Sequence, residues 1–175
     1  MKRETTRYCT RCATPLASRF IHGRVRPACP ACGFVVYVDP KVACAALIAR
    51  DNQVLLVRRR YQPGQGLWCL PCGFADADEP PERTVEREVA EECAVQVAVG
   101  SLLGAYHYLD DPRGAGILLV YRAQIDEGRP QAGDDADDIG FFSLDDLPPL
   151  SHSTHQRALA DWRRQQGEES GSEQS

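Results

Sequence analysis

The sequence lacks a hydrophobic segment of the length that a signal peptide or a transmembrane helix needs. Its first residues are charged and polar, and no later apolar run approaches about 20 residues. We therefore expect a cytoplasmic protein without a membrane partner. In that compartment, eight cysteines indicate metal binding, catalysis or small buried side chains before they indicate disulfides.

An excess of basic residues is also absent, because the formal net charge is −5. Proteins that bind nucleic acid in bulk need a positive surface, so a nucleic-acid partner is not expected. The charge is uneven: residues 1–32 contain seven basic residues and one acidic residue, and the acidic excess lies in the remainder. With 175 residues, the chain is long enough for one main domain with its own core and a small appendage.

Two Cys-x-x-Cys pairs, sixteen residues apart, lie in the basic N-terminal part. This spacing is typical of two knuckles that hold one tetrahedral ion, and four thiolates favour zinc. A redox-active or free thiol set is the alternative. We interpret residues 1–37 as a small zinc ribbon with a hairpin at 24–27, stabilised by its metal. Its role is structural or a homodimer contact, since it has little aromatic surface for stacking. The predicted zinc ligands are Cys9, Cys12, Cys29 and Cys32.

Strand-like segments follow the ribbon. Residues 42–49 and 53–57 read as a hairpin, and residues 96–109 and 117–125 as a second pair of strands. Three arginines end the first hairpin, where they are either a solvated strand end or phosphate contacts. From these segments we select Arg58, Arg60 and Tyr106 as candidate substrate contacts, although each residue type is as common on an ordinary strand.

An acidic helix is predicted to begin near Pro81, because Pro suits the first helical turn. Apolar residues recur at four-residue intervals along it, which predicts burial of that side against a sheet. Three glutamates, three and four residues apart, share an adjoining face and repel one another unless a cation or protons intervene. Hard divalent cations prefer such oxygen ligands. A solvated surface helix is the alternative. The carboxylates are those of Glu88, Glu91 and Glu92, and Arg87 on their flank can hold one of them by a bidentate pair.

Residues 70–95 match the Nudix box, G-x5-E-x7-R-E-U-x-E-E-x-G-U, in which U is aliphatic. The positions in register are Gly73, Glu79, Arg87, Glu88, Val89, Glu91, Glu92 and Val95. The chain therefore resembles the Nudix hydrolase family over roughly residues 39–165. Two positions depart from the pattern. Cys72 stands where Gly or Ala is usual, and Ala94 replaces the Gly that would end the helix in the left-handed region, a conformation that strains other residues.

The resemblance implies an α/β fold, namely a Nudix α/β/α sandwich with a mixed sheet over residues 38–166, preceded by the zinc ribbon. A disordered tail is expected at 167–175. The resemblance also implies that Mg²⁺ or Mn²⁺ is bound by Glu88, Glu91, Glu92 and the Gly73 carbonyl. Glu88 is then the general base, Arg87 orients it and Glu79 supports the loop. Asp134 and Asp135 lie where many relatives place a further base or ligand, or else form a solvated acidic turn.

The implied reaction is hydrolysis of a nucleoside diphosphate linked to another group. A zinc ribbon before a Nudix domain resembles enzymes that act on NADH, ADP-ribose or FAD. The NADH enzymes carry a Ser-Gln-Pro-Trp-type signature after the box, whereas residues 101–116 here read SLLGAYHYLDDPRGAG. We therefore rank ADP-ribose or FAD above NADH. The alternative is a Nudix-like regulator that senses ADP-ribose and contacts nucleic acid through its ribbon, but the chain keeps every box carboxylate, which favours an enzyme.

Overall fold

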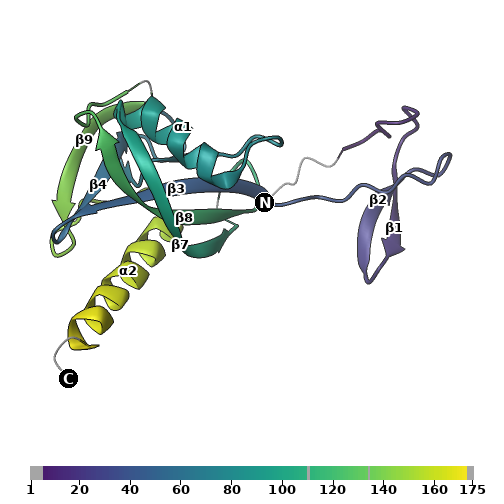
Figure 1. Ribbon diagram of the computed structural model, residues 1–175. Coiled ribbons are helices and arrows are strands. Elements are labelled where there is room, and N and C mark those ends of the chain that lie inside the picture. Colours follow the sequence, from purple (N-terminus) through teal and green to yellow (C-terminus); the bar gives the residue numbers. More distant parts are fainter. Residues whose placement is uncertain (1–5, 110, 134, 173–175) are drawn as a thin grey trace. The chain divides into compact units, whose positions relative to one another are not determined.

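The computed structural model describes residues 6–109, 111–133 and 135–172 (Figure 1). Asp134, one of the candidate site residues, lies outside the described residues. The chain divides into two compact units, unit 1 with Met1–Pro40 and unit 2 with Lys41–Ser175. No helix in the described ranges combines the length and the apolar character that crossing a membrane requires.

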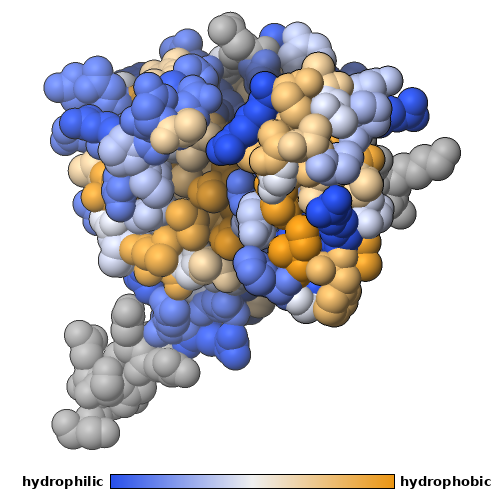
Figure 2. Space-filling model, turned by 90° about the vertical axis from the view of Figure 1, so that its right-hand side faces the viewer, coloured by the Kyte–Doolittle hydropathy of each residue, from blue (hydrophilic) through white to orange (hydrophobic). Residues whose placement is uncertain are grey.

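Unit 1 contains one antiparallel hairpin of β1 (Ala17–Ile21) and β2 (Arg24–Ala28). His22 and Gly23 connect the strands, and both have positive φ, at 48° and 75°. A two-residue loop with this backbone matches the right-handed twist of a hairpin. Several large apolar side chains of unit 1 stay exposed, namely Tyr8, Phe20, Val25, Tyr37 and Val38. On the face of the molecule that Figure 2 draws, hydrophobic patches are interrupted by hydrophilic residues.

Unit 2 is built on one sheet. The predicted hairpin is present as β3 (Lys41–Arg50) and β4 (Gln53–Arg59). The strand order is β5-β4-β3-β8-β7, while β6 pairs with β3 and β9 with β4. β3 and β8 are parallel and the other pairs are antiparallel, so the sheet is mixed, as predicted. The remaining strands are β5 (Trp68–Cys69), β6 (Cys72–Phe74), β7 (Gln96–Tyr108), β8 (Gly116–Glu127) and β9 (Ala136–Ser143).

The two helices cover different faces of this sheet (Figure 1). α1 (Pro81–Cys93) begins at the predicted proline and packs Val85, Val89 and Cys93 against one face. α2 (Ser153–Ser172) packs Leu159 and Trp162 against the other. Successive residues of β3 alternate between these two clusters, because strand side chains point to opposite faces. The predicted α/β/α sandwich is therefore confirmed.

Two local expectations differ from the structure. α2 continues to Ser172, so the predicted disordered tail is helical over 167–172. Extending an existing helix adds one hydrogen bond for each residue fixed, so the helix continues although two of these six residues are glycines. Ala94 adopts the left-handed region, with φ 54° and ψ 34°, and its N–H donates to Ala90 O. The helix thus ends as it would with Gly, at the cost of strain in Ala94.

Candidate active site and metal centre

The loop of the box lies directly on α1. β6 pairs with β3, which holds the backbone of Gly73 beside the helix. A Cβ atom on Gly73 would lie 1.9 Å from Glu88 Oε1, so a side chain at this position would displace the carboxylate. The Glu88 side chain is only 14% exposed. This close approach explains why the box requires glycine at residue 73.

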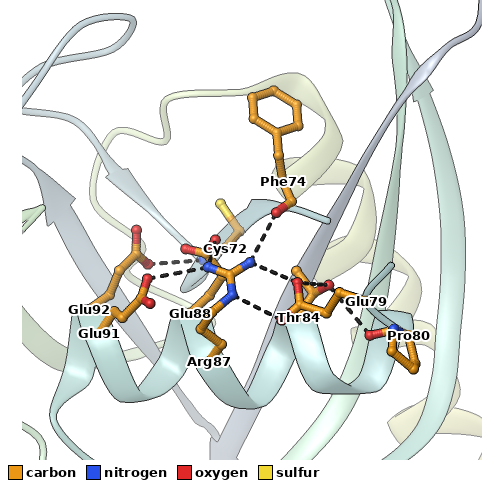
Figure 3. Close-up of polar contacts among 9 residues, drawn as sticks. All are labelled: Cys72, Phe74, Glu79, Pro80, Thr84, Arg87, Glu88, Glu91 and Glu92. Atoms are coloured by element: carbon orange, nitrogen blue, oxygen red, sulfur yellow. Dashed lines mark hydrogen bonds and ion pairs between the residues drawn. The ribbon is translucent and has the colours of Figure 1, made fainter. Parts of the chain in front are cut away.

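Arg87 is the centre of the polar network in Figure 3. Its Nε and Nη2 donate to the two oxygens of Glu79, each at 2.9 Å. Nη1 donates to Glu88 Oε1 at 2.7 Å and to Glu91 Oε2 at 3.3 Å, and Nη2 also donates to the Phe74 carbonyl at 3.1 Å. The bidentate pair thus forms with Glu79, and a single hydrogen bond reaches Glu88. The single positive charge of Arg87 thus faces three carboxylates.

Glu79 ties the loop to the helix. Hydrogen bonds from Arg87 lower the pKa of Glu79 to about 2, so this carboxylate is ionised near neutral pH. The hydroxyl of buried Thr84 also donates to Glu79 Oε2 at 2.8 Å. Glu79 thus connects the loop to Thr84 and Arg87 of α1, while its supporting role stays a prediction.

Glu92 is the most buried carboxylate of the trio, with 7% of its surface exposed. Its Oε2 accepts a hydrogen bond from the Cys72 N–H at 3.0 Å. Burial raises the pKa of Glu92 to about 9, and burial also raises the pKa of Glu88. Glu91 differs, because its side chain is 55% exposed and lies at the edge of the network.

The oxygen donors of α1 fit a hard divalent cation in kind and in charge, since buried carboxylates without enough cationic partners favour a bound ion. Their ligand atoms do not converge tightly, however. Within the described ranges, one group of at least three potential ligands has its atoms mutually within 4.8 Å, and that group is the cysteine set of unit 1. Arg87 lies between Glu88 and Glu91 instead.

A cavity of about 400 Å³ opens beside these carboxylates, within the range of small-molecule sites. Gly73, Arg87, Glu88 and Glu92 of the box line it. Asp135, from the loop before β9, lines it as well and contributes to the raised pKa of Glu88, after burial and the Glu91 charge. The structure therefore brings one residue of the predicted acidic loop to the box.

Arg58 and Arg60 do not line this cavity; Arg59 does. Arg58 pairs with Asp138 at 3.6 Å and Arg60 with Asp137 at 3.0 Å, both on the neighbouring β9 side. Because strand side chains alternate, the middle arginine points the other way. The cavity lining therefore does not support Arg58 and Arg60 as substrate contacts, and Arg59 is the arginine of this segment that borders the cavity.

Tyr106 is also absent from the cavity lining. It is 5% exposed, packs in the cluster under α2, and donates its hydroxyl hydrogen to Asp161 Oδ2 at 3.0 Å. This is the core position that strand tyrosines commonly take, so its position does not support a substrate contact.

Other cavity residues were missed, because they come from distant segments. His155 of α2 accepts a hydrogen bond at Nδ1 from the Leu70 N–H at 3.2 Å. Burial lowers the pKa of His155 to about 3, so the ring is neutral and carries its proton on Nε2. Asp111 and Arg113 form a bidentate pair at the same cavity, with Arg113 stacked over the Phe74 ring at 4.5 Å. No local pattern in the sequence marks these residues as neighbours, because they lie in segments far apart along the chain.

The four cysteines of unit 1 form two matching knuckles. The Ala13 N–H donates to the Cys9 carbonyl, and the Gly33 N–H donates to the Cys29 carbonyl. Both donor residues have positive φ, at 56° and 75°. Three of the distances between the cysteine sulfurs are 3.5–3.6 Å. Zn–S bonds of about 2.3 Å in a tetrahedron place sulfurs about 3.8 Å apart, so the set fits one such ion with little adjustment. Hydrogen bonding with Thr14 lowers the pKa of Cys12 to about 6, which favours a thiolate.

Comparisons with known proteins agree with this geometry. Residues 39–162 match the model of the NUDIX domain. The ADP-ribose pyrophosphatase of Methanocaldococcus jannaschii is 39% identical over 130 residues, which cover 74% of this chain and 76% of that protein. The NAD-capped RNA hydrolase NudC of Pseudomonas aeruginosa (strain LESB58) is 35% identical over 147 residues, 82% of this chain and 50% of NudC, so the chain spans about half the length of that relative.

Among solved structures, a NUDIX hydrolase from Nitrosomonas europaea superposes with a TM-score of 0.77 at 25% identity and covers 88% of both chains. The domain match covers most of the sequence, the Methanocaldococcus relative is aligned over three quarters of its own length, and four residues of the box line one cavity. The chain belongs to the Nudix hydrolase family.

Proposed function

We propose that this chain hydrolyses the diphosphate of a nucleoside diphosphate linked to another group, with ADP-ribose or FAD preferred and NADH less favoured. The observation that carries the proposal is the pair of buried carboxylates, Glu88 and Glu92, that border a nucleotide-sized cavity. Arg87 cannot neutralise both, because it is also committed to Glu79. The name of the Methanocaldococcus relative, an ADP-ribose pyrophosphatase, supports the substrate class.

The cations that suit this site are Mg²⁺ or Mn²⁺. Glu88, Glu92, the outer Glu91 and the Gly73 carbonyl would hold them. When bound, such an ion offsets the charge of the diphosphate and lowers the pKa of a coordinated water.

The residues of the chain supply the other requirements. Glu88 accepts the proton of the attacking water, and burial helps by raising the pKa of its carboxyl. Arg87 Nη1 fixes the orientation of Glu88, while Glu79 fixes Arg87. Asp135 lies close enough to serve as the further acid or base.

Unit 1 is proposed to hold one Zn²⁺ through Cys9, Cys12, Cys29 and Cys32. The contacts between the sulfurs and the two matching knuckles support this ion, because thiolate sets of four favour zinc. A structural role and a contribution to a homodimer stay predictions, as does a cytoplasmic location.

The test is product release from ADP-ribose, FAD, NADH and nucleoside triphosphates, each with Mg²⁺ and with a chelator. We expect AMP from ADP-ribose or FAD in the presence of Mg²⁺, and none after Glu88→Gln. Tight binding of ADP-ribose by the wild-type chain without turnover of any compound would favour the alternative, a regulator that senses the nucleotide. Release of phosphate or pyrophosphate from triphosphates alone would refute the proposed substrate class.

A further inference from the structure

Besides the carboxylates of the box, basic side chains also line the cavity. Three arginines line the cavity: Arg59, Arg87 and Arg113. Arg87 is held by carboxylates (Figure 3), and Arg113 forms a bidentate pair with Asp111. Arg59 instead donates from Nε to Pro63 O at 2.7 Å and has a long contact of 4.0 Å with Cys69 Sγ. In the part of the chain that the structure describes, no carboxylate pairs with Arg59, so its charge is available to a ligand.

The first turn of α2 adds further donors at the same cavity. Thr154 lines the cavity, is 4% exposed, and has no side-chain hydrogen bond among the described residues. Each fully buried side-chain oxygen or nitrogen in those residues has a partner, so the Thr154 hydroxyl keeps some accessible surface, and the cavity that Thr154 lines can supply its partner. The positive end of the α2 helix dipole also lies at this first turn.

Arg59 and the start of α2 lie side by side. A Cβ atom on Gly64 would be 2.9 Å from Ser151 Cβ and 3.5 Å from Arg59 Cδ, so the side chains of Ser151 and Arg59 both lie next to Gly64. The Ser151 N–H donates to Trp68 O at 2.8 Å, which fixes the segment just before the helix to β5. The guanidinium, the Thr154 hydroxyl and the helix start therefore belong to one wall.

We propose that Arg59, the Thr154 hydroxyl and the first turn of α2 form an anion subsite that binds a phosphate group of the ligand. The identification of that phosphate with part of the substrate rests on the proposed function. A guanidinium together with a helix N-terminus is a strong combination for a phosphate. The charge of Arg59 would also attract a phosphate to a cavity that is otherwise lined by several carboxyl groups.

The test compares the binding of AMP and adenosine to the full chain, with zinc retained in unit 1 and magnesium omitted. Both ligands offer the same base and sugar, so the ratio of their affinities isolates the phosphate. We expect the wild-type chain to prefer AMP, and Arg59→Ala to reduce that preference by at least tenfold. Thr154→Val, which keeps the shape and removes the hydroxyl, should reduce it about threefold to tenfold.

The chain supplies matched controls. Arg58→Ala removes the adjacent guanidinium, which points to Asp138, and should leave the preference within twofold of wild type. Arg59→Lys keeps the charge and should retain part of the preference, provided that thermal unfolding of each variant stays close to wild type. An Arg58→Ala loss equal to that of Arg59→Ala would overturn the proposal, as would a wild-type chain that binds AMP no better than adenosine. If the preference depends on Arg59 but no diphosphate is hydrolysed, the subsite stands and the proposed function fails.

Discussion

Glu92→Gln should change stability and activity in opposite directions. Glu92 is 7% exposed, and burial raises its pKa to about 9. In the unfolded chain a glutamate has a pKa of about 4.3. Between these values the folded protein binds a proton that the unfolded chain does not bind, so the free energy of unfolding falls as pH rises from about 5 to 9. Without a divalent cation, the wild-type chain should therefore be less stable at pH 8 than at pH 5.5.

The size of this effect follows from about 1.4 kcal/mol for each pKa unit. Over two and a half pH units the limit is about 3.4 kcal/mol, and relaxation around Glu92 lowers the expected loss to about 1–3 kcal/mol. Gln is isosteric and neutral and keeps an oxygen for the Cys72 N–H. Glu92→Gln should remove this part of the pH dependence and be more stable than wild type at pH 8. Urea unfolding at pH 5.5 and pH 8, in the presence of a chelator, measures how the free energy of unfolding changes with pH for wild type and for Glu92→Gln.

With Mg²⁺ present, the same substitution removes a proposed ligand. Turnover should fall at least 100-fold, which corresponds to about 2.7 kcal/mol of lost transition-state stabilisation. Glu86→Gln is the matched control, since Glu86 lies on the same helix and pairs with Arg83 at the surface. It should leave turnover unchanged and alter stability by no more than about 0.5 kcal/mol.

Two results would refute this reasoning separately. Turnover of Glu92→Gln within about threefold of wild type at saturating Mg²⁺, under about 1 kcal/mol, would remove Glu92 from the metal site. Equal pH slopes for wild type and Glu92→Gln without the cation would show that the buried carboxyl does not hold a proton in the folded state.

Three further substitutions test separate parts of the structure. Gly73→Ala should lower turnover at least 100-fold, because the added Cβ would meet the Glu88 carboxylate at 1.9 Å; kinetics equal to wild type would contradict this contact. Ala94→Gly should raise the free energy of unfolding by about 0.5–1 kcal/mol, since it relieves a residue at φ 54°, and a loss of stability in urea unfolding would argue against strain there. Cys29→Ser should abolish the bound zinc and unfold unit 1 while the core of unit 2 stays folded; metal analysis of the wild-type chain that finds less than half an equivalent of zinc would count against the site.

The box could be recognised from the sequence because its pattern lies within one continuous segment, residues 70–95. Pro81 starts α1 in both the prediction and the structure, and the apolar side chains at four-residue spacing are the ones that pack against the sheet. The motif also requires glycine at residue 73. Only the fold shows that a Cβ atom at this residue would lie 1.9 Å from Glu88 Oε1. Wherever a helical period or a fixed spacing carries the information, no long-range contact has to be known.

The rest of the cavity depends on contacts between distant segments. Leu70 and His155 are joined by a hydrogen bond across 85 positions, and nothing near either residue indicates the other. Asp135 reaches the box through the pairing of β9 with β4, which no local pattern specifies. The length of α2 was underestimated for a different reason, since a polar end of a helix has the same composition as a disordered tail.

One physical reason explains why the sequence did not show that Arg58, Arg60 and Tyr106 lie outside the cavity lining. In a sheet covered by helices on both faces, both alternating sets of strand residues are buried, so polarity does not reveal which set faces the site. Along β4, Leu55 and Val57 pack with α1, while Val54 and Leu56 pack on the side of α2. At the end of β4 the pairing with β9 shifts register between Arg58 and Arg59. Arg59 borders the cavity, whereas Arg58 and Arg60 pair with Asp138 and Asp137 of β9. Which of the three arginines reaches the cavity therefore depends on this long-range pairing, which the sequence alone does not specify.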